Sequence, residues 1–200
     1  MDKNIRVVDV ENLSENWGKL KKYTFEITHR DGTRQRHERE VYDRGNAAVV
    51  LLRDPVRDTV ILTRQFRLPV HVNGDSGYQI EACAGLLDGD DPETCARKEA
   101  EEETGFRVTD IRHIFDSYMS PGSVTEKLHF FVAHYDAAAQ VSAGGGLDHE
   151  GEDIEVLEMP FKSALAMIGS GEIVDAKTIM LLHYAALEAA VISSGTDPGR

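Results

Sequence analysis

Three glutamates in residues 91–105, which read DPETCARKEAEEETG, could hold a metal ion. Glu99, Glu102 and Glu103 are spaced i, i+3 and i+4, so in a helix they project from one face within a single turn. Like charges at this spacing destabilise a helix by about a few tenths of a kcal/mol per pair. A divalent cation would offset the repulsion, and carboxylate oxygens are ligands that Mg²⁺ prefers. The same run could instead be the solvated acidic face of a surface helix.

The segment before this helix favours a metal site. Residues 84–88, AGLLD, form a loop whose small residues let the backbone approach a ligand closely. Carboxylates and one approachable carbonyl make an incomplete oxygen cage, which leaves positions for water and phosphate oxygens. Mg²⁺ sites in phosphoryl-transfer enzymes are built in this way. The sequence therefore predicts Mg²⁺-dependent phosphate chemistry.

The elements that must position these glutamates can be read from the hydrophobic pattern. Asp91 suits the N-cap of the acidic helix, Pro92 its first turn and Gly105 its C-terminal stop. Two later helices are expected at 161–168 and 177–191. Strands are expected at 23–27, 33–42, 47–52, 60–66, 79–83, 111–117, 128–135 and 154–157. Many strands, one central helix and two late helices predict an α+β fold, layered as an α/β/α sandwich.

Composition excludes several classes of partner. The chain has 200 residues and a formal net charge of −13, which argues against binding nucleic acid or an anionic membrane. No run of apolar residues has the length of a signal peptide or a membrane span. Cys83 and Cys95 lack metal-ligand or redox spacing and are expected to be buried reduced thiols. We expect a soluble, cytoplasmic protein.

Residues 84–106, AGLLDGDDPETCARKEAEEETGF, resemble the signature of the Nudix hydrolases, Gly-x5-Glu-x7-Arg-Glu-(aliphatic)-x-Glu-Glu-x-Gly-(aliphatic). Aligned without gaps, the matching residues are Glu99, Glu102, Glu103, Gly105 and Phe106. Ala84, Asp90 and Lys98 replace the Gly, Glu and Arg of the signature. The alanine is harmless if that position binds metal through its main-chain carbonyl. The lysine keeps the charge of arginine but loses its planar fork, so its pairing with a glutamate is weakened.

The resemblance extends from about Trp17 to Leu187 and is closest to the bacterial GDP-mannose pyrophosphatase subgroup, near the ADP-ribose pyrophosphatases. The segments that carry it are VYDRGNAAVVLL, RQFR, IEACAGLLD, YMSPGSVTEKLHFF, EDIEVLEMPF and GEIVDAKT. It implies a Nudix fold with an additional N-terminal antiparallel sheet. In this division residues 1–45 serve dimerisation and the nucleotide pocket, 46–192 form the Nudix hydrolase domain, and 193–200 are a disordered tail. It also implies a homodimer that uses Mg²⁺, or Mn²⁺, to hydrolyse GDP-mannose to GMP and mannose 1-phosphate.

The resemblance also implies roles for individual residues. The Ala84 carbonyl and the carboxylates of Glu99, Glu103 and Glu152 would bind metal. Glu152, in the acidic loop 148–153, would take the proton of the attacking water, with Glu102 and Glu103 as the other catalytic carboxylates. The residues implied in substrate binding are Trp17, Glu38, Arg39, Glu40, Arg67, Ala84, Glu126 and Lys177. Without the resemblance, the charged residues would be ordinary surface charges. Trp17, the single tryptophan, lies in a polar segment and could either stack on a base or serve as a packing anchor.

One departure bears on specificity. Glu38 stands where a lysine is expected in the subgroup, so the choice of base or the affinity for phosphate is open. ADP-ribose or another sugar nucleotide is the alternative substrate. A Nudix-fold sensor that binds a nucleotide without hydrolysing it is a second alternative, and the retained glutamates of the signature argue against it.

Overall fold

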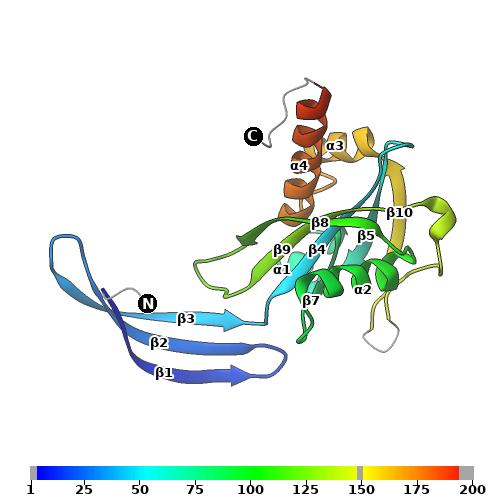
Figure 1. The fold of residues 1–200 in the computed structure, drawn as a ribbon. Coiled ribbons are helices and arrows are strands. Elements are labelled where there is room, and N and C mark those ends of the chain that lie inside the picture. Colours follow the sequence, from blue (N-terminus) through cyan, green and yellow to red (C-terminus); the bar gives the residue numbers. More distant parts are fainter. Residues whose placement is uncertain (1–3, 148–150, 194–200) are drawn as a thin grey trace. The chain divides into compact units, whose positions relative to one another are not determined.

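The computed structural model describes residues 4–147 and 151–193, and it divides into two compact units (Figure 1). The first unit combines the N-terminal residues up to Asn46 with the segment Ser117–Leu128. The second unit contains Ala47–Asp116 and the chain from His129 onward. Each unit is built around its own sheet.

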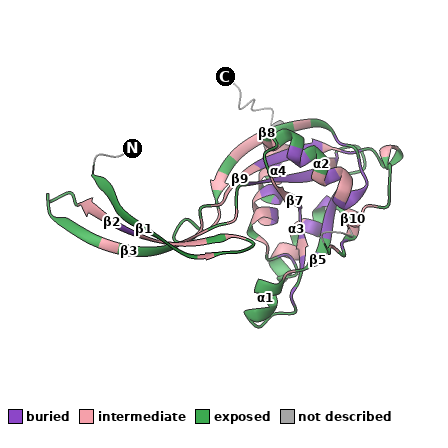
Figure 2. Ribbon diagram, turned by 90° about the horizontal axis from the view of Figure 1, so that it is seen from below, coloured by how far each residue is buried: buried purple, intermediate pink, exposed green. Residues whose placement is uncertain are grey.

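The first unit contains a three-stranded antiparallel sheet in the order β1 (Ile5–Glu15), β2 (Lys19–Thr28), β3 (Arg34–Asp43). Asp31 closes the turn between β2 and β3 by accepting a hydrogen bond from the Thr33 backbone N–H at 2.9 Å. The additional N-terminal antiparallel sheet is thus confirmed. Strand β1 itself was not expected from the pattern, because two shifts of register along it break the alternation that marks a strand. Most of β1 and β3 is exposed (Figure 2).

The segment Ser117–Leu128 belongs to the first unit because it bonds to the end of β3. The Tyr42 backbone N–H donates to the Ser123 carbonyl at 2.8 Å, and the Thr125 N–H donates to the Tyr42 carbonyl at 3.0 Å. The Thr125 hydroxyl also donates to the Asp43 carboxylate at 2.9 Å. These bonds fix the position of Glu126, which follows directly.

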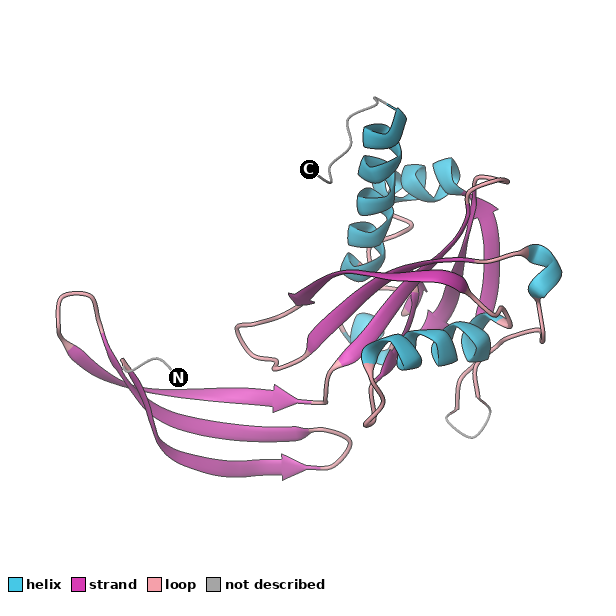
Figure 3. Ribbon diagram, in the orientation of Figure 1, coloured by secondary structure: helices cyan, strands magenta, loops and turns pink. Residues whose placement is uncertain are grey.

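The second unit contains a seven-stranded sheet. Its strands are β4 (Ala47–Asp54), β5 (Thr59–Phe66), β6 (Tyr78–Glu81), β7 (Cys83–Leu86), β8 (Thr109–Tyr118), β9 (Lys127–His134) and β10 (Glu155–Pro160). The main order is β10-β5-β4-β9-β8, with β6 paired to β5 and β7 paired to β4. Helix α2 (Pro92–Thr104) covers one face, and α3 (Phe161–Ser170) and α4 (Ala176–Ser193) cover the other (Figures 1 and 3). The predicted α+β sandwich is therefore confirmed.

Strand β4 lies at the centre of this sheet and is buried on both faces. One face, Ala48, Val50 and Leu52, packs with the Cys95, Ala96 and Ala100 side of α2. Burial on two faces explains why the β4 sequence is a continuous apolar run with no alternation. The same packing holds α2 against the sheet, which positions the glutamates of this helix.

The observed elements differ from the expected ones in several places. Residues 78–86 form two short strands, β6 and β7, rather than one strand at 79–83 followed by a loop, because the chain leaves β5 after Glu81 and pairs with β4 from Cys83 onward. The short helix α1 (Leu68–Val72) and the 3-10 turn η1 (Ala137–Ala139) were not expected. Helix α4 ends at Ser193, and the remainder of the expected tail lies outside the described residues. None of the helices in the described part of the chain is long and apolar enough to cross a membrane.

Candidate active site

Helix α2 begins and ends at the residues that the sequence indicated. The Asp91 side chain accepts hydrogen bonds from the backbone N–H groups of Glu93 and Thr94, at 3.2 and 3.1 Å. Gly105 ends the helix in the left-handed conformation, with φ of 78°. The ends set the length of the helix, and the packing of its Cys95, Ala96 and Ala100 side sets its rotation. This rotation turns Glu103 inward, while Glu99 and Glu102 are partly exposed.

Glu103 is the most deeply buried acid of the site. Glu103 is 2% exposed, and its Oε2 atom has no hydrogen-bond partner among the described residues. Burial raises the pKa of Glu103 to about 8, and the charges of Glu99 and Glu152 add to the shift, while Arg67 and the Cys83 thiol oppose it. A buried, unpaired carboxylate oxygen is costly. A cation at this position would remove that cost.

Glu99 lies directly over the backbone of β7. A Cβ atom added to Gly85 would overlap the Glu99 carboxylate, so a larger residue here would have to displace this side chain. The Cys95 thiol donates to the carbonyls of Gly85 and Leu86, at 3.5 and 3.3 Å, and so ties α2 to β7. Gly85 directly follows Ala84, whose carbonyl is the expected main-chain ligand. The sequence analysis expected a close approach by the small residues of AGLLD, and the side chain that approaches Gly85 is that of Glu99.

Glu152 is brought to this end of α2 by the loop before it. The N–H groups of Gly145 and Gly146 donate to the carbonyls of Glu103 and Glu102, at 2.9 and 3.1 Å. The Leu147 N–H then donates to the Glu152 carboxylate at 3.0 Å. Residues 148–150 of the expected acidic loop lie outside the described residues. Glu152 is near enough to Glu103 to contribute to the raised pKa of that group.

Arg67 and Lys177 meet around a buried acid that the sequence analysis did not identify. Glu81 is 5% exposed and pairs with the Arg67 guanidinium at 2.7 Å and the Lys177 ammonium at 3.3 Å. Lys177 also pairs with Asp175 at 2.6 Å. Burial lowers the pKa of both cations, but the charges of Glu81 and Asp175 outweigh it and leave the pKa of each above its ordinary value. Both cations are therefore fully charged.

Glu81 was missed because its strand runs against the usual pattern. In β6 the polar residues Gln79 and Glu81 face inward, whereas Tyr78 and Ile80 are more exposed. An interpretation based on hydrophobic alternation turns such a strand the other way. The two polar residues at alternate positions of YQIE, residues 78–81, were the available local signal.

The remaining expected residues belong to the first unit. Trp17 is 73% exposed, with the Arg44 guanidinium 4.9 Å from the ring centroid, and Arg44 also pairs with Glu126 at 3.3 Å. Arg44 thus links two of the expected residues and was itself not expected. On β3 the register places Glu38 and Glu40 on one face and Arg39 on the other. These three neighbours cannot all contact one ligand on the same face of the sheet.

Comparison with known proteins identifies the family. A model of the NUDIX domain matches residues 43–182, which include the whole glutamate cluster. The chain belongs to the Nudix family. Residues 4–42 of this Nudix chain match a second model, described as the GDP-mannose pyrophosphatase NudK N-terminal domain.

Curated relatives agree with this assignment over nearly the whole length. The GDP-mannose pyrophosphatase of Klebsiella pneumoniae subsp. pneumoniae is 52% identical and covers 98% of each chain. That of Escherichia coli O1:K1 / APEC is 54% identical, over 92% of this chain and 96% of the relative. A solved structure titled "Crystal structure of ADP compounds hydrolase" has a TM-score of 0.71 at 18% identity and covers 98% of each chain, which supports the Nudix fold. The family resemblance stated from the sequence is confirmed.

Nudix hydrolases generally use a divalent metal, and the glutamate cluster of this Nudix chain fits one. The fit rests on the Oε2 atom of Glu103, a buried acceptor without a partner in the described part of the chain. The fit requires movement, however. In the described part of the chain, the group of three side chains with ligand atoms within 4.8 Å of one another is His113, Asp116 and His129, so Glu99, Glu103 and Glu152 would have to move closer to bind one ion together.

Proposed function

We propose that the chain hydrolyses the diphosphate bond of a nucleotide sugar, namely GDP-mannose, to GMP and mannose 1-phosphate. The observation that carries the proposal is the buried Glu103 carboxylate, which has an unpartnered oxygen and lies beside Glu99 and Glu152 in a Nudix domain. The names of the relatives and the match of residues 4–42 support GDP-mannose in particular.

In this proposal the carboxylates of Glu99 and Glu103 and the Ala84 carbonyl hold Mg²⁺. All three offer oxygen, which suits Mg²⁺ and also Mn²⁺. When bound, the ion neutralises the phosphate oxygens and makes water a better nucleophile at neutral pH. Because Gly85 has no side chain, the Glu99 carboxylate lies beside the main chain that directly follows Ala84. The carboxylate and the Ala84 carbonyl can therefore bind the same ion.

Glu152 accepts the proton of the attacking water. Water adds to one phosphorus, the bond to the bridging oxygen breaks, and the second phosphate leaves with that oxygen. Only Oε2 of Glu152 is bonded to the Leu147 N–H, so the loop fixes the carboxylate while its other oxygen can take the proton. Glu102 contributes through its carbonyl, which holds Gly146, and is the next candidate for the base.

Arg67 and Lys177 bind phosphate oxygens in this scheme. Glu81 keeps both cations close together and charged, and Arg67 is the more exposed of the two, with 38% of its side chain accessible. A diphosphate would compete with Glu81 for the guanidinium. Arginine can bind such oxygens in a bidentate manner, whereas lysine acts as a point charge.

The first unit would supply nucleotide recognition and the dimer contact. We assign the base to Trp17, whose exposed ring is large enough for stacking, with Glu126 as a polar contact. Either Arg39 or the pair Glu38 and Glu40, which lie on opposite faces of β3, would add further polar contacts. The homodimer would use the sheet of this unit, because several of its large apolar side chains are exposed, among them Ile5, Val7 and Val10. Cys83 and Cys95 are both free and buried, which suits the reducing cytoplasm.

A screen of sugar nucleotides tests the proposal. The purified chain should convert GDP-mannose to GMP and mannose 1-phosphate, identified by chromatography, with a higher kcat/KM than for ADP-ribose. Excess EDTA should abolish turnover, and added Mg²⁺ should restore it. A clear preference for ADP-ribose would move the substrate assignment, and full turnover in EDTA would refute the metal mechanism.

A further inference from the structure

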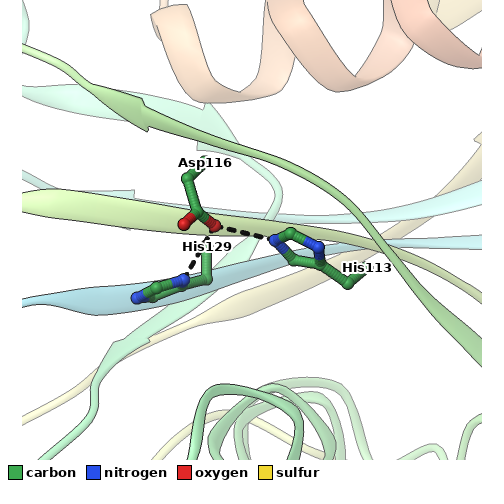
Figure 4. Close-up of side chains that lie close together, drawn as sticks. All are labelled: His113, Asp116 and His129. Atoms are coloured by element: carbon green, nitrogen blue, oxygen red, sulfur yellow. Dashed lines mark hydrogen bonds and ion pairs between the residues drawn. The ribbon is translucent and has the colours of Figure 1, made fainter.

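A second group of metal-ligand side chains lies outside the Nudix signature, on strands β8 and β9 (Figure 4). The Nε2 atom of His113 is 2.7 Å from the Oδ1 atom of Asp116. The Nδ1 atom of His129 is 2.8 Å from the same oxygen. All three ligand atoms lie within 4.8 Å of one another. Two imidazoles thus converge on one carboxylate.

An interruption in the alternation of β8 makes this convergence possible. Residues three apart on a regular strand point to opposite faces. Here Arg112 and Phe115 both contact Tyr184 of α4. His113 and Asp116 instead both point to the side of the sheet that carries His129 and Phe131 of β9. Asp116 bonds to His129, and the ring centroids of His113 and Phe131 are 5.3 Å apart. The two faces of β8 therefore each hold a pair of residues that a regular strand would separate.

The cluster lies on the side of the sheet that α2 covers. Phe131 belongs to the core cluster that includes Cys95 and Ala96 of this helix. Solvent still reaches the three side chains, which are 49%, 37% and 14% exposed for His113, Asp116 and His129. An ion bound here would keep coordination positions for water.

The donor set selects the kind of metal. Imidazole nitrogen suits Zn²⁺, Cu²⁺, Ni²⁺ and Fe²⁺, whereas Mg²⁺ prefers an all-oxygen shell. Ligand atoms of a tetrahedral Zn²⁺ site lie roughly 3.4 Å apart, given metal–ligand distances of about 2.0–2.2 Å. The observed separations of 2.7 and 2.8 Å need to open by less than about 1 Å, within reach of a carboxylate rotation.

We propose that His113, Asp116 and His129 bind a borderline divalent transition metal, represented by Zn²⁺, independently of the Mg²⁺ site of the signature. A nitrogen binds metal through its lone pair, so His113 Nε2 and His129 Nδ1 must carry no proton when the ion is bound. Each neutral ring then holds its proton on the other nitrogen. The bound ion then joins β8 to β9 through side chains from both strands. Because it binds only the folded chain, it raises the melting temperature.

Calorimetry with Zn²⁺ and visible absorption with Co²⁺ test the proposal, on the full chain in saturating Mg²⁺. Mg²⁺ competes for the glutamate site, and any probe that still binds there should bind equally in the parent and in every histidine variant. The wild-type chain should bind one equivalent and melt at a higher temperature with Zn²⁺. His113→Gln and His129→Gln should each weaken binding by at least about 10- to 100-fold, since loss of a ligand costs no less than loss of its supporting partner. His113 is half exposed, so this variant should fold even if the other does not.

His134→Gln is the matched control. His134 lies on β9, as His129 does, its side chain is 44% exposed, and its Nδ1 atom pairs with Asp110 at 3.3 Å. This variant should bind Zn²⁺ and Co²⁺ as the parent does. The proposal is wrong if the parent binds neither ion in Mg²⁺, or if His113→Gln and His134→Gln bind them equally well.

Discussion

At the residue scale, the site depends on two glutamates that the fold places in different surroundings. Glu103 is held in the interior by α2, with an oxygen that no described donor reaches. Glu152 is held by a loop, through the Leu147 N–H. A group fixed in the cage should act on metal affinity, whereas a group on a loop should act on the attacking water. Substitution can separate these roles.

Glu103→Gln should lower kcat and raise the Mg²⁺ concentration needed for half-maximal activity, because it removes charge from the cage.

Glu152→Gln should lower kcat by about 10²- to 10⁴-fold, the usual cost of losing a general base. Its affinity for GDP-mannose, measured by calorimetry, should stay within a few-fold of the parent. Glu101→Gln is the control for both variants, because Glu101 is a neighbouring acid that pairs with Arg107 at 3.1 Å. It should leave kcat and the Mg²⁺ concentration for half-maximal activity unchanged. If Glu152→Gln keeps a kcat near that of the parent, Glu152 is not the general base, and Glu102 or Glu103 becomes the candidate.

The pKa of Glu103 predicts how the metal-free protein responds to pH. Burial raises this pKa from 4.5 to about 8, so between these values the folded chain keeps a proton that the unfolded chain has lost. The free energy of unfolding should therefore fall as pH rises through this window, by at most about 1.4 kcal/mol per pH unit from this group. Urea unfolding in EDTA at several pH values measures it. Glu103→Gln cannot ionise and should lack this part of the slope; an unchanged slope would contradict the burial argument.

At the element scale, the C-terminus of α2 joins the helix to the loop that carries Glu152. Gly105 has φ of 78°, and a Cβ there would overlap the Ser142 carbonyl as well as strain the backbone. Gly89 has φ of 97° and open space around it. Both glycines thus have a positive φ, and Gly105 alone of the two has a close contact with the loop.

Gly105→Ala should therefore destabilise the chain by more than the roughly 1–2 kcal/mol that a left-handed alanine costs. It should also lower kcat, because the loop that positions Glu152 must shift. Gly89→Ala should show the backbone cost alone and keep its activity. Urea unfolding and GDP-mannose turnover measure both variants. Equal effects of the two substitutions would show that the loop does not depend on this close contact.

The same contrast between local and distant contacts explains what the sequence could predict. Helix α2, its two ends and the shared face of Glu99 and Glu103 follow from rules that act within a few residues. The partners Glu81 and Arg44 depend on strands brought together from elsewhere in the chain. No spacing rule finds the pair His113 and Asp116, because a regular strand would hold them apart. The individual site roles remain predictions.

At the scale of the whole molecule, the first unit presents exposed apolar side chains on one face of its sheet. Cross-strand pairing puts Ile5 opposite Ile27, Val7 opposite Phe25 and Val10 opposite Tyr23. The register shift after Val7 keeps Val10 on the same face, so the apolar residues of two strands form one surface. Ile5, Val7 and Val10 are all exposed in the monomer. Such a surface usually marks an interaction site.

The double substitution Val7→Lys and Val10→Lys should therefore convert a homodimer to a monomer. Like charges would be buried against their copies across the two-fold interface, and unpaired buried charge is strongly unfavourable. Light scattering at micromolar concentration should give twice the 22.2 kDa chain mass for the parent and a single mass for the variant. Val56→Lys places the same charge on an exposed turn outside this sheet and should leave the dimer intact. A monomeric parent would refute the dimer, and a dimeric double variant would place the interface elsewhere.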